Sequence, residues 1–192
     1  MTSPVPSPGS SPVDGLDPTL VALARCVHET EVHVSAGGWD GPVRVFALVN
    51  TARALAADPA IATLLPAGTR VDDPHHLLAI EQEGLPEADS LESLLAQLAW
   101  PDAVDGAAVV VERLVVPPDA EADLPGDLSE DEAVARLAAH PGAEDVRLAA
   151  GVLRTGESWC AIRARGHDDD LEVAGGQDAV PGLVAALRAT LS

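Results

Sequence analysis

The chain has 192 residues with a formal net charge of −20, and 47 % of the residues are hydrophobic. A chain of this size and apolar content can bury a core without disulfides or a metal, which excludes a wholly disordered protein. Nucleic-acid backbones and anionic membrane surfaces repel so acidic a chain, so we expect neither as a partner.

The first half of the chain predicts a tail followed by alternating helices and strands. Residues 1–15 are rich in Pro, Ser and Gly, and predict a disordered tail ahead of one globular domain over 16–192. The tail lacks the basic start and apolar core of a secretion signal. Asp17 before Pro18 is typical of a helix start, and apolar spacing carries this helix to about Val34. A turn at 37–42, a strand over 43–49, helical turns over 52–65, a strand over 77–82 and a helix from Ser90 follow.

The next strand, Ala107 to Val116, is almost entirely apolar and predicts a central strand that is covered on both faces. Glu112 and Arg113 interrupt its apolar run, and neighbours in a strand face opposite ways, so they cannot pair with each other. Each therefore needs a partner to offset its desolvation. The candidates are Arg147, Arg163 or Arg165 for Glu112, and Glu81 or Glu83 for Arg113.

The last third of the chain predicts an acidic loop, a helix, a strand hairpin and a final helix. Ser129 and Glu132 form a capping box at the start of a helix that ends near residue 140. Strands over 146–153 and 158–165 flank a tight turn, a short strand at 171–174 is possible, and a helix closes the chain.

The order of these elements predicts an α/β or α+β fold. We expect a single mixed β-sheet of about five or six strands, with a C-terminal antiparallel hairpin and about five flanking helices. The early strands, which alternate with helices, favour a parallel portion of this sheet.

No motif of specific chemistry is present, so we predict no catalytic residues, no metal site and no cofactor. All eleven basic residues are Arg, which excludes lysine Schiff-base chemistry. The histidines of Asp72–His76 are adjacent and point apart, and Asp168–Asp170 lacks the further oxygen ligands of a calcium loop. Cys26 and Cys160 are expected to be reduced and buried, as in a cytoplasmic protein.

Six residues are candidates for a binding role. Trp39 and Trp100 are either packing residues or exposed anchors for a partner, in a chain with few other aromatic residues. The other candidates are ionisable and surround the central strand. They are Glu81, Glu83, Glu112 and Arg113.

Several short phrases of the sequence occur together. They are Gly38-Trp39-Asp40, Glu81-Gln82-Glu83-Gly84-Leu85-Pro86, Trp100-Pro101, Val111-Glu112-Arg113, Trp159-Cys160-Ala161 and His167-Asp168-Asp169-Asp170. With these phrases the chain resembles a family of small acidic actinobacterial proteins of unknown function, over nearly all of its length after the tail. The resemblance implies a cytoplasmic actinobacterial protein, and carries over no catalytic or binding residue.

Three functions remain open from the sequence. The first is a non-catalytic cytosolic module that binds a protein partner, which the negative charge and the lack of a catalytic motif favour. The second is a small enzyme or ligand-binding protein with Glu81, Glu83, Glu112 and an arginine converging in one cleft. The third is a chaperone-like protein, which requires an exposed apolar patch near Trp39 or Trp100. The oligomeric state is left open.

Overall fold

The computed structural model describes residues 17–192 apart from 118–119, 121–123, 126–127 and 178. The predicted tail, residues 1–15, and part of the predicted acidic loop lie outside the described residues. Six strands form one sheet in the order β2-β1-β3-β4-β5-β6. The strands are β1 (Arg44–Asn50), β2 (Leu77–Glu81), β3 (Gly106–Val115), β4 (Glu144–Leu153), β5 (Ser158–Ala164) and β6 (Ala174–Gly176).

The described residues also contain five α-helices and two short 3-10 segments. The helices are α1 (Pro18–Ser35), α2 (Thr51–Ala57), α3 (Leu91–Leu95), α5 (Glu130–Ala138) and α6 (Pro181–Ala189), and the 3-10 segments are η1 (Pro59–Thr63) and η2 (Arg165–His167). The α+β class, the single six-stranded sheet, the helices and the closing antiparallel hairpin are thereby confirmed. The Asp17 carboxylate caps α1 by accepting from the Thr19 amide at 2.8 Å, and the capping box of Ser129 and Glu132 begins α5.

The sheet is antiparallel throughout, so the expected parallel portion is absent from the described strands. β2 and β3 do run in the same direction, and α3 connects them as in a parallel crossover. However, β1 lies between them and pairs with both. In α2, which follows β1 directly, only Thr51 is buried, so this helix does not cover a sheet face, and the chain re-enters as β2 beside β1. The last strand forms at Ala174–Gly176 instead of the expected 171–174.

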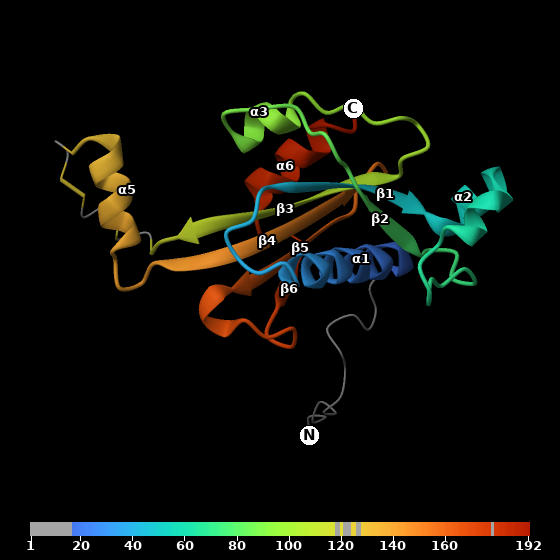
Figure 1. The fold of residues 1–192 in the computed structure, drawn as a ribbon, viewed down its shortest axis with the longest axis horizontal. Helices are drawn as coiled ribbons and strands as arrows, with labels where there is room; N and C mark the ends of the chain where they lie inside the picture. The colour runs from blue at the N-terminus through green and yellow to red at the C-terminus, as the bar shows by residue number, and fades with distance from the viewer. Residues whose placement is uncertain (1–16, 118–119, 121–123, 126–127, 178) are drawn as a thin grey trace, which may run out of the picture.

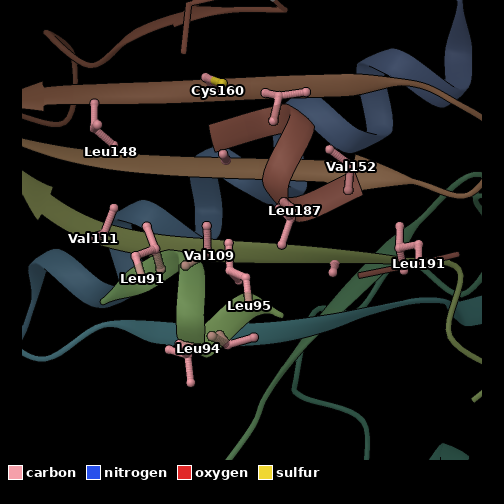
Figure 2. Close-up of a cluster of buried hydrophobic side chains, with 14 of the residues drawn as sticks. Leu91, Leu94, Leu95, Val109, Val111, Leu148, Val152, Cys160, Leu187 and Leu191 are labelled. Carbon is pink, nitrogen blue, oxygen red and sulfur yellow. The ribbon is translucent and has the colours of Figure 1, made fainter. Parts of the chain in front are cut away.

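Helices cover both faces of the sheet (Figure 1). One core lies between the sheet and α1, and includes Leu23, Val27, Phe46, Leu48 and Val110. The second core lies under α3 and α6, whose leucines lie over the sheet, with α1 on the far side (Figure 2). β3 alternates between the two cores and is buried from Gly106 to Val111, which confirms the predicted central strand. No described helix is long and apolar enough to cross a membrane.

Candidate functional site

Charged side chains cross the sheet on the face that α1 covers. Glu112 on β3, Arg147 on β4 and Arg163 on β5 lie opposite one another in the strand register. Successive residues of a strand alternate between faces, and Val110, Ala149 and Ala161, two positions away from them, pack in the core under α1. The three charged groups therefore extend beneath the C-terminal half of this helix.

Glu31 of α1 completes a buried ion network with these arginines. Its carboxylate accepts from Nε and Nη2 of Arg163 at 2.8 and 2.7 Å, and lies 3.6 Å from Nη1 of Arg147. Glu31 and Arg147 are fully buried, and Arg163 is 2 % exposed. The hydrogen bond to Glu31 raises the pKa of Arg163 despite its burial, because it favours the charged guanidinium.

The turn after α1 binds the outer side of this network through Trp39. The guanidinium carbon of Arg147 lies 4.3 Å from the centre of the Trp39 ring, and the indole donates to Asp168 at 2.9 Å. This hydrogen bond from Trp39 lowers the pKa of Asp168. Gly38 and Asp40 adopt left-handed backbone angles, with φ of +83° and +65°, which turn the indole back over the arginine.

Further ion pairs attach the same turn to the hairpin. Arg165 donates to Asp40 at 2.6 Å and to Asp145 at 3.2 Å, and the hydrogen bond from Arg165 lowers the pKa of Asp40. Arg163 also pairs with Asp168 and with Asp170. Two of the three carboxylates at 168–170 therefore bind Arg163, although both remain partly exposed.

We call Glu31, Glu112, Arg147, Arg163 and Asp168 the ion cluster. Glu112 accepts from Arg147 at 2.8 Å and from the Asp40 amide at 2.6 Å, and Arg147 also donates to the Gly38 carbonyl. A cavity of about 130 Å³ beside Glu112 and Arg147 has room for a few water molecules. Nε and Nη1 of Arg147 form no hydrogen bond with an acceptor among the described residues. These groups bind one another and hold α1, the Trp39 turn and the sheet together.

A larger recess lies between α1 and the edge strand β2. We call it the α1–β2 groove; its volume is about 430 Å³. Glu29 and His33 line it from α1, Ala79 and Glu81 line it from β2, and the Phe46 ring contributes apolar surface. Residues 66–70 complete the lining. The groove therefore combines apolar surface with carboxylates on both of its walls, and one arginine, Arg70, also lines it.

Two ionisable groups in the groove, Glu81 and Cys26, have shifted pKa values. Arg44 Nε donates to Glu81 at 2.6 Å, and this hydrogen bond lowers the pKa of the Glu81 carboxyl. His33 Nε2 lies 3.3 Å from Nη2 of the same arginine. Cys26 also lines the groove, and burial raises its pKa to about 12, so its thiol is protonated near neutral pH. Cys26 is therefore no thiolate nucleophile.

The candidate residues around β3 have separate partners. Glu112 pairs with Arg147, one of the three arginines that the sequence offered. The predicted partner of Arg113 is wrong: Glu81 binds Arg44 across the β1–β2 pair, and Arg113 donates only to the backbone of Glu112 among the described contacts. Arg113 is exposed, so it needs no buried counter-ion. Glu83 is exposed in the loop after β2.

Both tryptophans are packing residues. Trp39 stacks on Arg147, while Trp100 packs against the α3–α6 core and donates to the Thr190 hydroxyl at 2.9 Å. The exposed large apolar side chains belong to other positions, namely Leu64, Val71, Ile80, Leu114, Val115, Val134 and Leu171. Neither Trp39 nor Trp100 is therefore among the large apolar side chains that are exposed in the described part of the chain.

The acidic candidates do not converge in one cleft. Glu81 lines the α1–β2 groove and Glu112 lines the small cavity beside Arg147, while Glu83 lines neither of these two recesses. Glu81 and Glu112 share a sheet face, but β1 lies between β2 and β3 and places Arg44 between them. An enzyme or ligand-binding cleft built from these three acids is thus not formed.

Sequence reasoning missed Glu31, the most buried acid of the ion cluster. A signal was present, because Glu31 continues the helical stripe of Leu23, Val27 and Val34 at spacings of four, four and three residues. A charge within such a stripe needs a buried partner, although the helix alone does not say which one.

No group of three or more His, Cys, Asp or Glu residues in the described part of the chain is arranged to hold a metal ion. The comparison with family models decides the relationship, because one model matches residues 23–192, from α1 to the end of the chain. The chain belongs to the PPA1309-like protein family. The matched part of this PPA1309-like chain includes the whole ion cluster and both walls of the α1–β2 groove. No curated protein and no solved structure matches it.

Proposed function

We propose that the protein is a non-catalytic binding module that takes a basic segment of a partner protein in the α1–β2 groove. The observation that carries this proposal is the groove itself, an open recess beside a strand at the edge of the sheet. Grooves between a helix and a sheet edge suit extended peptides, because the strand offers backbone hydrogen bonds and the recess accepts side chains.

The charge around β2 supports a basic partner. No Arg or Lys occurs between Arg70 and Arg113, while Asp72 and Glu83 flank the strand on its two sides. Asp73 and Glu81 lie beside them and pair with Arg25 and Arg44. Glu29 faces the groove from α1 and is exposed. A segment with Arg or Lys side chains would gain attraction from these carboxylates during approach and in the complex.

The state of the buried polar groups supports binding over catalysis. The charged groups of the ion cluster bind each other, and the Cys26 thiol in the groove stays protonated near neutral pH. The acidic surface and the family resemblance further favour a cytoplasmic actinobacterial protein.

The test is a synthetic peptide array probed with the purified protein. It carries 12-residue peptides that alternate Val with Arg, with Glu or with Ser. We expect the Arg series alone to bind. Ala79→Trp fills the groove and should lose this binding. Ala96→Trp places the same side chain at an exposed position at the end of α3 and should keep the binding. Equal binding by both variants, or no binding to the Arg series, would overturn the proposal.

A further inference from the structure

We infer that the bound segment adds to the sheet as a seventh strand beside β2, which specifies the binding mode of the proposed function and rests on it. In an antiparallel pair, residues alternate between those that bond to the partner and those whose backbone groups point away. The Gln82 amide donates to the Val45 carbonyl, and the Thr51 amide donates to the His76 carbonyl. The positions that bond to β1 are therefore 76, 78, 80 and 82.

The alternate residues of β2 present the free edge. The backbone groups of Leu77, Ala79 and Glu81 point away from β1, and no described hydrogen bond from another segment engages them. They offer three donors and three acceptors, spaced about 7 Å apart along the strand. An extended peptide can satisfy this row, because its own donors and acceptors repeat at the same interval.

The same alternation directs the side chains of an added strand. Leu77, Ala79 and Glu81 line the groove, so segment residues opposite them place their side chains between β2 and α1. Those side chains meet the Phe46 ring, the carboxylate of Glu29 and the carboxylate of Glu81, which also pairs with Arg44. The intervening side chains face the other side of the sheet near Ile80, which is 49 % exposed. The segment that fits is thus extended, with basic groups on its groove side and apolar groups opposite.

A second copy of this chain fits the edge less well. Asp72 and Asp73 precede β2, Glu81 is its last residue and Glu83 follows it. If β2 paired antiparallel with β2 of another copy, the carboxylates at one end would therefore face those at the other end. Each copy carries a net charge of −20, which adds to this repulsion. The charge therefore selects a basic partner over self-pairing.

The test uses an alternating Val/Arg peptide with single N-methyl groups placed along it. An N-methyl removes one donor and blocks approach on one edge of a strand. For strand addition, affinity measured by calorimetry should fall about tenfold or more at alternate positions and stay nearly unchanged between them. Amide exchange should slow at Leu77, Ala79 and Glu81 when the peptide binds.

A matched pair of variants tests the protein side. Ala79→Pro removes an outward-pointing donor, which edge strands tolerate, so the fold should persist while affinity falls about tenfold. The control is Ala96→Ser, at the exposed C-terminal end of α3, which should leave both the fold and the affinity unchanged. Binding that is insensitive to both the N-methyl register and Ala79→Pro would overturn strand addition while leaving the groove as a binding site. If the unmodified peptide fails to bind, the proposed function fails first.

Discussion

At the scale of single residues, the charged groups that the sheet buries are structural. Glu31 lies between two arginines that have almost no contact with solvent. Burying an ion pair in place of apolar residues gains little stability, but removing one partner leaves an uncompensated charge in the interior. Removing the carboxylate of Glu31 should therefore reduce the free energy of unfolding much more than removing an exposed carboxylate from a similar pair.

Glu31→Gln keeps the size of the side chain and removes its charge. We expect the free energy of unfolding to fall by about 3–5 kcal/mol, as when one partner of a buried pair is lost. The measurement is urea denaturation at neutral pH. Glu81→Gln is the control, because its pair with Arg44 is partly exposed and contributes about 1 kcal/mol or less. Similar losses for the two variants would contradict the structural role of Glu31.

Ionisation of Asp168 makes the stability of the fold depend on pH in a direction that its pKa shift determines. Its pKa in the folded protein is lowered, first by the hydrogen bond from Trp39, so its ionised form stabilises the fold. This contribution is complete above the ordinary value of about 3.9 and is lost as pH falls through the lower folded value. Asp168→Asn should therefore flatten the loss of stability as pH falls below about 4, measured as urea midpoints, whereas exposed Asp102→Asn should not. Parallel curves for wild type and Asp168→Asn would refute this.

At the scale of elements, the position of α1 depends on a glycine in the strand beneath it. A Cβ on Gly151 of β4 would lie 2.5 Å from Cγ2 of Val27 and 3.2 Å from Cδ1 of Leu23. Both helix residues are fully buried, so neither has space to move aside. The missing side chain lets α1 approach the sheet closely enough for Glu31 to reach its arginines.

Gly151→Val should displace α1 and reduce stability by about 1–3 kcal/mol, the usual cost of overpacking a core. The control is Gly182→Ala at the start of α6, where an added Cβ meets nothing within 4 Å and the helix gains propensity. Thermal unfolding of both variants gives the comparison. If Gly151→Val unfolds at the same temperature as the wild type, the position of α1 does not depend on this glycine.

Most elements could be predicted from the sequence, whereas their pairing could not. Capping residues and apolar spacing are local signals, and they gave α1, β3 and α5 with bounds close to those observed. Strand direction depends on whether the connecting helix crosses a face of the sheet, and α2 covers neither face. A charged residue in a covered strand needs a partner of opposite charge, and the sequence offered three arginines of the hairpin as partners for Glu112. Glu31 and the groove come from contacts between segments that are distant in sequence.

At the scale of the whole molecule, the net charge of −20 acts on stability as well as on partner choice. Repulsion among the carboxylates opposes the compact state, and added salt screens exposed charges much more than buried ones. Because the ion cluster is mostly buried, screening relieves repulsion without weakening the main ion pairs.

Raising NaCl from about 0.02 to about 0.5 M, which shortens the screening length severalfold, should therefore raise the melting temperature. A triple variant, Glu83→Gln, Glu87→Gln and Asp89→Asn, changes the net charge from −20 to −17 (−20 + 3), and its melting temperature should rise less with salt. Calorimetry of both proteins tests this. A melting temperature that falls with salt would show that exposed ion pairs outweigh the repulsion.

The positions of the three tryptophans have a practical consequence. Trp39 covers the ion cluster, Trp100 lies beside α6, and Trp159 packs on the α1 side of the sheet. The chain contains no tyrosine and one phenylalanine, a weak emitter, so its ultraviolet emission comes mainly from these three indoles. Variants that keep one indole each would report separately on the turn and on the two helical layers. The fold thus carries its own set of local optical probes, without any attached dye.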